Sequence, residues 1–282
     1  MEFIIWFFLI ALTIASFQDL KRREVDNWLN LLILFSGAAF IVFEALFSQN
    51  PEVIFLGIFS FLVMFLLCNL FYYMRIFAGG DAKLLFALFA VFVSASFFST
   101  IYNILGFVFF LFLAGGIYGL GWSCVLFFSN YNDCVDEMKR RFKDFKLLLI
   151  VGAILLFSGI IIWLSNLGVG YYCFLIGMLL LIGGFLMLFA KSIEDKSMIK
   201  KLKAEDLRPG DWLYEDVSIG KNKIKADWQG LSEEEINMLR RSKKKVKIKQ
   251  GIPFVPSFLI AYIIWFFIID IFPFFDIKVF FY

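Results

Sequence analysis

Long apolar segments recur along this chain of 282 residues and restrict its fold more than any other feature. Hydropathy predicts eight of them, at 2–17, 28–47, 53–74, 84–99, 102–128, 147–165, 170–190 and 253–272. A helix of about 20 apolar residues crosses a bilayer with its backbone hydrogen bonds satisfied internally. A membrane β-barrel needs short alternating strands, whereas these runs are continuous. The sequence therefore predicts an all-α polytopic membrane protein with about eight transmembrane helices.

The basic residues predict how these helices are oriented. All 27 lysine and arginine residues except Lys278 fall in four segments, at 18–27, 75–83, 129–146 and 191–252. Basic residues are enriched in the cytoplasmic loops of membrane proteins. We therefore expect a multi-pass protein of the cell (plasma) membrane with these four segments in the cytoplasm.

The same pattern divides the chain into four parts. Residues 1–128 form a transmembrane block, and 129–190 a basic cytoplasmic loop followed by a helical hairpin. Residues 191–250 are polar and predict a small cytoplasmic α+β lobe, while 251–282 contain the last span. In the lobe, Ser232 and Glu235 form a helix-capping pattern, and the alternating run 243–249 predicts a strand. Its lysines either attract anionic lipid headgroups or form an ordinary solvated face.

Two aspartates, Asp19 and Asp81, lie beside apolar spans on the same predicted side of the membrane. A carboxylate is costly to place there, so its default interpretation is functional. Two such groups can share one proton and activate a water molecule. Each also has a simpler interpretation by itself. Asp19 can pair with Lys21 or Arg22, and Asp81 can cap the helix that follows Gly79 and Gly80.

Glycine and proline mark two further segments. Gly79 and Gly80 precede Asp81, and glycine lets a backbone approach a substrate or a neighbouring helix closely. Pro253 and Pro256 precede the last span. These prolines either interrupt regular helix, so that free backbone groups can pair with an extended substrate, or simply mark the start of the helix.

Other catalytic chemistries lack the residues they need. The chain has no histidine, and its four cysteines are scattered without a Cys-x-x-Cys pair. These facts argue against zinc sites of the usual Cys/His type and against histidine-based triads. We expect no cofactor and no bound metal.

Three segments, Asp19–Trp28, Gly79–Leu84 and Gly251–Pro256, resemble the type IV prepilin peptidases, and most of all their archaeal preflagellin peptidase branch. These enzymes are intramembrane aspartyl proteases marked by a Gly-x-Gly-Asp motif, in which Ala78 replaces the first glycine here. The resemblance implies a six-helix core to which the hairpin 147–190 is added. It also implies catalytic roles for Asp19 and Asp81. On these grounds we expect substrate contacts at Gly79, Gly80, Pro253 and Pro256.

The resemblance further implies an aspartic-type endopeptidase that removes short basic leader peptides at the cytoplasmic membrane face. Its partners would be pilin-like or archaellin-like precursors and the lipid bilayer, with no nucleic acid. Glu24 and Asp26 either attract the basic leader or balance neighbouring positive charges. Two alternatives remain open: a multi-pass transporter with the aspartates as an ion site, and a non-catalytic assembly scaffold. The transporter would need ionisable groups near the bilayer midplane, but Glu44 and Asp270 fall near the outer ends of spans.

Overall fold

The computed structural model describes residues 2–165, 168–219, 222–227, 230–242 and 245–268. The chain divides into two compact units. The first unit comprises Met1–Leu120 together with Ile252–Tyr282, and the second comprises Gly121–Gly251. The first unit therefore joins residues 1–120 of the predicted block 1–128 to the segment of the predicted last span, although more than a hundred residues separate them in sequence.

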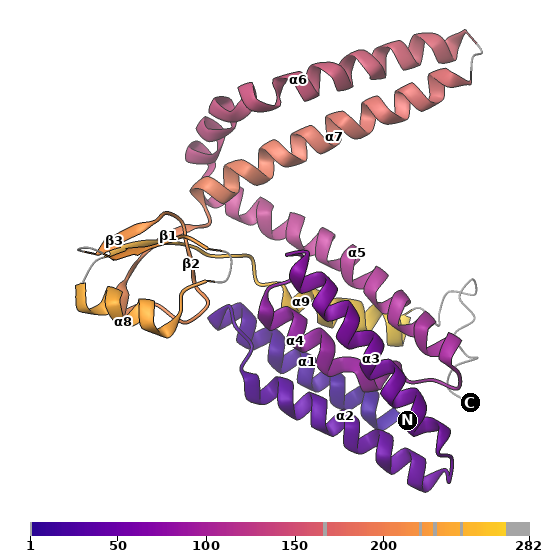
Figure 1. Cartoon of the computed structure of the whole chain (residues 1–282). Helices are drawn as coiled ribbons and strands as arrows, with labels where there is room; N and C mark the ends of the chain where they lie inside the picture. Colours follow the sequence, from indigo (N-terminus) through magenta and orange to yellow (C-terminus); the bar gives the residue numbers. More distant parts are fainter. Residues whose placement is uncertain (1, 166–167, 220–221, 228–229, 243–244, 269–282) are drawn as a thin grey trace. The chain divides into compact units, whose positions relative to one another are not determined.

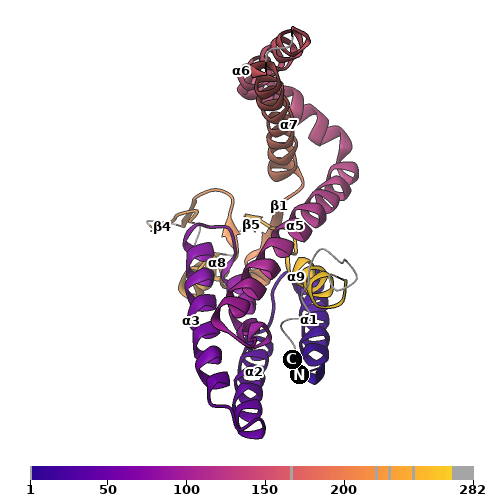
Figure 2. The same cartoon turned by 90° about the vertical axis from the view of Figure 1, so that its right-hand side faces the viewer.

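The first unit is built from apolar helices around a common hydrophobic core (Figures 1 and 2). Its elements are α1 (Glu2–Arg22), α2 (Asn27–Phe47), α3 (Glu52–Tyr73), α4 (Gly79–Ala87), the 3₁₀ helix η1 (Leu88–Phe92), the first part of α5 (Phe97–Ser129), α9 (Val255–Ile263) and the π-helical turn η3 (Ile264–Ile268). The outward faces of the long helices carry large exposed apolar side chains such as Phe35, Phe55 and Leu66. Lipid-facing surfaces have this composition, because no water is present there to penalise apolar exposure.

The fourth predicted span, 84–99, is not a single helix. α4 has nine residues and is followed by a 3₁₀ helix of five residues. Nine helical residues rise about 13 Å, less than half of the roughly 30 Å hydrocarbon thickness. Three buried side chains satisfy the backbone where the helix breaks. Ser60 donates to the carbonyl of Phe89 (2.6 Å) and Asn103 to that of Phe92 (3.4 Å), while Thr100 accepts the N–H of Ser94 (3.2 Å).

α9 runs antiparallel to α1. At one end the backbone of Val255 contacts Asp19, and at the other the hydroxyl of Tyr262 donates to the carbonyl of Ile5 at 3.0 Å. Tyr262 is fully buried in the first unit's core. The long-range packing of α9 on α1 thus fixes the last helix of the described chain beside the first.

The second unit begins with a helical hairpin. α6 (Tyr131–Leu164) and α7 (Val169–Lys196) pack along each other through glycines spaced seven residues apart, at positions 152 and 159 of α6 and 170, 177 and 184 of α7. A Cβ added at Gly159 would lie 2.3 Å from the backbone nitrogen of Phe174. Small residues allow such close backbone approach between membrane helices. The basic segment 129–146, predicted as a loop, is helical on both sides of Asn130.

Six described helices are long and apolar enough to cross a membrane, namely Phe3–Arg22, Asn27–Phe47, Glu52–Tyr73, Phe97–Ser129, Tyr131–Leu164 and Val169–Lys196. The predicted count of eight is not confirmed. The broken segment 79–92 is one reason. Val255–Phe267 is a shorter apolar helix, and residues 269–272 of the predicted last span lie outside the described residues.

The lobe follows α7 and has the predicted α+β character. β1 (Ile199–Lys203), β5 (Lys245–Lys249) and β2 (Trp212–Leu213) form an antiparallel sheet in the order β1-β5-β2, and β3 (Val217–Ile219) pairs with β4 (Asn222–Ile224). The short 3₁₀ helix η2 (Ala204–Asp206) follows β1. α8 (Glu233–Ser242) begins with the predicted cap, in which the backbone N–H of Ser232 donates to Glu235 at 2.9 Å. β5 confirms the predicted strand from residue 245 onward; residues 243–244 lie outside the described residues.

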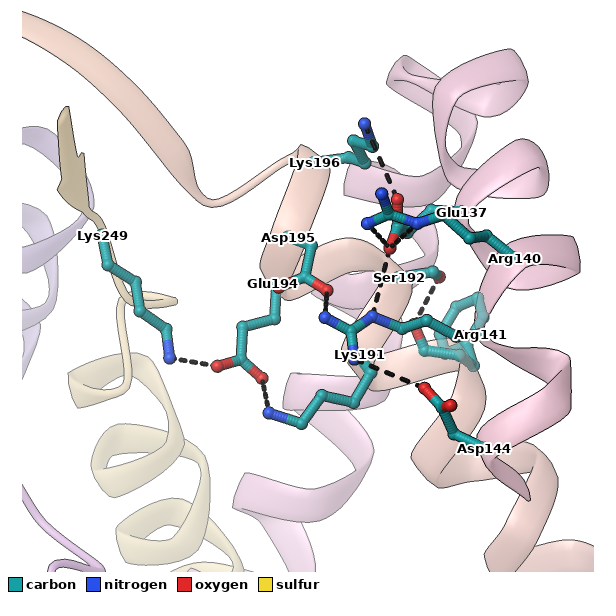
Figure 3. A network of polar contacts seen from close by, with 11 residues as sticks. Glu137, Arg140, Arg141, Asp144, Lys191, Ser192, Glu194, Asp195, Lys196 and Lys249 are labelled. Carbon is teal, nitrogen blue, oxygen red and sulfur yellow. Dashed lines mark hydrogen bonds and ion pairs between the residues drawn. The ribbon is translucent and has the colours of Figure 1, made fainter. Parts of the chain in front are cut away.

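A polar network joins α6, α7 and β5 within the second unit (Figure 3). Glu137 is buried, and its carboxylate pairs with Arg140, Arg141 and Lys196. Glu194 pairs with Lys191 at 2.9 Å and with Lys249 of β5. A buried carboxylate is tolerated only where such partners compensate its charge. The network therefore ties the polar end of the hairpin to the sheet.

Candidate active site

Asp19 lies in the last turn of α1 and is 5% exposed. Its Oδ2 accepts a hydrogen bond from the backbone N–H of Val255 at 2.9 Å, and the Phe254 backbone donates to the same carboxyl group. Val255 is the first residue of α9. The first N–H groups of a helix have no partner inside the helix and carry partial positive charge, so they stabilise a carboxylate. Asp19 thus caps the start of α9.

Pro253 and Pro256 flank the two residues whose N–H groups face Asp19, and both prolines are buried. Proline has no N–H and fixes its own φ angle, so the pair restricts both the conformation and the donors of this short segment. The backbone N–H groups of Phe254 and Val255, which lie between the two prolines, therefore donate to Asp19. Phe254 also fills the space beside Gly115, where an added Cβ would lie 2.6 Å from its ring.

Arg23 supplies a positive charge beside Asp19. It follows α1 with φ of 60°, a left-handed conformation that costs a non-glycine residue about 1 kcal/mol or more. Its backbone N–H donates to the carbonyl of Asp19 at 2.8 Å, and its guanidinium interacts with the Asp19 carboxylate. Burial lowers the pKa of Arg23, and the charge of Asp19 opposes that effect. The neighbouring Arg22 lies 3.5 Å from Asp26 instead.

Asp81 is the third residue of α4 and lies partly buried. The N-cap of this helix is Ala78, and the Asp81 carboxyl group accepts the backbone N–H of Ala78. A side chain at the third position that reaches back to the N-cap is half of a capping box. Asp81 therefore helps to start α4, although from inside the first turn rather than from the cap position considered in the sequence.

The structure brings Asp19 and Asp81 close enough to act on each other. Burial, and after it the negative charge of Asp19, raise the pKa of Asp81 to about 7. Asp19 has an arginine and two backbone donors, all of which favour a charged carboxylate, whereas a backbone N–H is the donor to Asp81. Such a pair of carboxyl groups can hold one shared proton near neutral pH, bound mainly to Asp81. The two groups then titrate together rather than independently.

The two glycines before Asp81 differ in their surroundings. A Cβ added at Gly80 would meet nothing within 4 Å, and one at Gly79 would reach the Tyr72 ring at 3.7 Å. Neither glycine has a positive φ. Neither packing among the described residues nor backbone conformation therefore requires glycine at Gly80, and the space beside it can admit another chain.

One contributor to this site was missed in the sequence. Arg23 stands four residues after Asp19, and opposite charges at this spacing on a helix were a readable signal.

Comparison with known proteins bears on this part of the chain. The family model of the type IV leader peptidases matches residues 6–120. This segment is similar to that family. The resemblance read from Asp19–Trp28 and Gly79–Leu84 is thereby confirmed, and the match indicates a peptidase. Searches of curated proteins and of solved structures found no significant match. The matched segment contains both aspartates but not α9, whose backbone holds Asp19.

Proposed function

We propose that the chain is a membrane-embedded aspartyl endopeptidase that removes a short basic leader from pilin-like or archaellin-like precursors. The observation that carries this proposal is the electrostatic interaction by which the charge of Asp19, after burial, raises the pKa of Asp81. These residues lie in different helices, and both fall inside the segment that matches a leader peptidase family. The charge pattern of the sequence supports a site that faces the cytoplasm.

In the proposed mechanism the two carboxyl groups hold one water molecule between them. Asp19, beside Arg23 and the α9 backbone, acts as the general base that accepts a proton from this water. Asp81 carries the shared proton and donates a hydrogen bond to the scissile carbonyl oxygen, which gains negative charge as water attacks. The proton taken by Asp19 then passes to the leaving amine.

The substrate would approach along the open side of Gly80. An extended leader backbone needs close approach to Asp81, and any side chain at Gly80 would occupy that space. Gly79 would share this role. Pro253 and Pro256 would act indirectly, by holding the Phe254 and Val255 donors on Asp19. The Asp26 carboxylate accepts hydrogen bonds from the Arg22 guanidinium and, at 3.2 Å, from the Trp28 ring nitrogen. These bonds favour its charge-balancing role.

The test is a membrane cleavage assay with a panel of pilin-like and archaellin-like precursors, read by mass spectrometry of the product termini. Wild type should cut after the basic leader, and Asp19→Asn and Asp81→Asn should each lose the activity. Asp26→Asn makes the same chemical change outside the pair and should retain it. Full activity in both single variants, or no cleavage by correctly inserted wild type, would exclude the proposed mechanism.

A graded pair of variants tests the substrate path. Gly80→Ala should reduce cleavage moderately and Gly80→Leu should abolish it, while both proteins insert and fold normally, because a Cβ at this position meets no atom of the described residues within 4 Å. Unchanged cleavage by Gly80→Leu would show that the substrate does not pass there.

A further inference from the structure

Four lysines gather on one face of the three-stranded sheet in the lobe. Lys201 and Lys203 of β1 lie directly opposite Lys247 and Lys245 of β5, and all four are exposed. Like charges directly opposite each other destabilise a sheet. The lobe thus maintains an unfavourable arrangement that a negative partner would relieve. We call these four residues the lysine face.

The opposite side of the sheet is already covered. Val246 and Ile248 of β5 and Leu213 of β2 are buried in a core with Ile236 and Leu239 of α8. Figure 1 shows α8 along one side of the sheet. Because side chains alternate along a strand, the lysines must point away from α8.

Two aromatic side chains share the lysine face. Trp212 pairs with Lys249 in the sheet register, and the Tyr214 backbone N–H donates to the Lys247 carbonyl at 3.0 Å, so both rings project on the lysine side. Both are exposed. Tryptophan and tyrosine beside basic residues are typical of surfaces at the headgroup level of a membrane.

Acidic groups within the lobe neutralise this face only in part. Glu215 lies 3.1 Å from Lys247, and both side chains are about half exposed. The Lys249 side chain lies on the same face of the sheet, but it forms an ion pair with Glu194 of α7 (Figure 3). Among the described residues, Lys201, Lys203 and Lys245 appear in no ion pair.

The lobe is held near the bilayer by its connection to α7. This helix is apolar enough to cross a membrane and ends at Lys196, and β1 starts at Ile199. The Met198 N–H donates to the Ile193 carbonyl, and the Gln250 N–H donates to the Met198 carbonyl at 2.8 Å. β1 therefore starts, and β5 ends, beside the C-terminal end of α7. The nearest large anionic surface at that end of a membrane helix is the headgroup layer.

We propose that the lysine face, with Trp212 and Tyr214, docks on anionic lipid headgroups of the bilayer that contains α7. The phosphates pair with the lysine ammonium groups, and the two rings enter the headgroup region. Docking places negative charge beside Lys201, Lys203, Lys245 and Lys247 and so removes their mutual repulsion. This inference concerns the second unit and does not depend on the proposed peptidase activity.

Lysine labelling tests it in the full-length protein. The chain is placed in nanodiscs of phosphatidylcholine alone, or of phosphatidylcholine mixed with phosphatidylglycerol, and treated with an amine-reactive reagent before mass spectrometry. Labelling of the four lysines should be roughly fivefold slower in the anionic discs, and high salt should restore it. Lys223 and Lys225, exposed lobe lysines outside this face, should react equally in both.

A second measurement uses substitution. In the fourfold Lys→Gln variant at 201, 203, 245 and 247, hydrogen exchange of the β1 amides should no longer differ between the two lipid mixtures. Lys223→Gln with Lys225→Gln should retain the difference. Equal wild-type labelling in both mixtures would overturn the proposal. Slow labelling in both would also overturn it, because protein rather than anionic lipid would then cover the face.

Discussion

Replacing Asp81 by asparagine should stabilise the protein at neutral pH but not in acid. The folded chain raises the pKa of Asp81 from 3.8 to about 7, first through burial and second through the charge of Asp19. Asparagine keeps the size of the side chain and an oxygen that can accept the Ala78 N–H, but it cannot ionise. The variant therefore removes the unfavourable charge and little else.

The sign and size of the effect follow from proton linkage. Below about pH 3 the Asp81 carboxyl is protonated in both the folded and the unfolded chain, so wild type and variant should be equally stable. As the pH rises, the unfolded carboxyl ionises first, and the stability of the wild type falls until about pH 7. The difference between a pKa of 3.8 and one of about 7 corresponds to about 4 kcal/mol. Asp81 is only partly buried, so solvent screening should reduce this to about 2 kcal/mol.

The assay is denaturant or thermal unfolding of purified protein in detergent, followed by circular dichroism across this pH range. Asp81→Asn should gain stability over wild type steadily between about pH 4 and about pH 7, and then keep a constant margin. Asp26→Asn should leave the pH trend of the wild type in place. An Asp81→Asn margin that is the same in acid and at neutral pH would refute the reasoning, because burial would then not disfavour the charged form.

Three further predictions follow. Cleavage should fall about tenfold per pH unit above about pH 7, as Asp81 loses its proton, and initial rates across that range measure this. Gly177→Ala should lower the free energy of unfolding of the hairpin by about 1–3 kcal/mol, because its Cβ would lie 2.3 Å from a backbone nitrogen of α6. Gly183→Ala should be neutral in the same thermal assay, because a Cβ there meets no atom of the described residues within 4 Å. Glu137→Gln should lower the free energy of unfolding by about 1 kcal/mol, because the cations that pair with Glu137 are partly exposed. Asp136→Asn changes only one exposed ion pair and should lower it by less.

The helices α2 and α3 and the cap of α8 were readable from the sequence because they depend on local signals. The predicted spans 28–47 and 53–74 agree within a residue with Asn27–Phe47 and Glu52–Tyr73. Their ends coincide with the ends of apolar runs. Ser232 and Glu235 bond each other within one helical turn, so the pattern needs no information from the rest of the chain.

The break after α4 could not be read in the same way. Hydropathy reports whether a segment avoids water, and the run 84–99 does so whether or not it is a regular helix. The break is stabilised by Ser60 and Asn103, which lie on other helices and bond the carbonyls of Phe89 and Phe92. Polar residues inside the predicted spans were the available signal, because a buried polar side chain needs a partner.

The site itself combines both kinds of information. Asp19 and Asp81 were found from their own positions, but the surroundings that distinguish them come from elsewhere in the chain. Val255, which donates to Asp19, lies 236 residues away and outside the segment 6–120 that matches the peptidase family. A chain ending at residue 120 would retain both carboxyl groups and lose the α9 donors that hold Asp19. The matched segment therefore contains both aspartates, and α9 makes the two carboxyl groups chemically unequal, which the proposed roles of general base and general acid require.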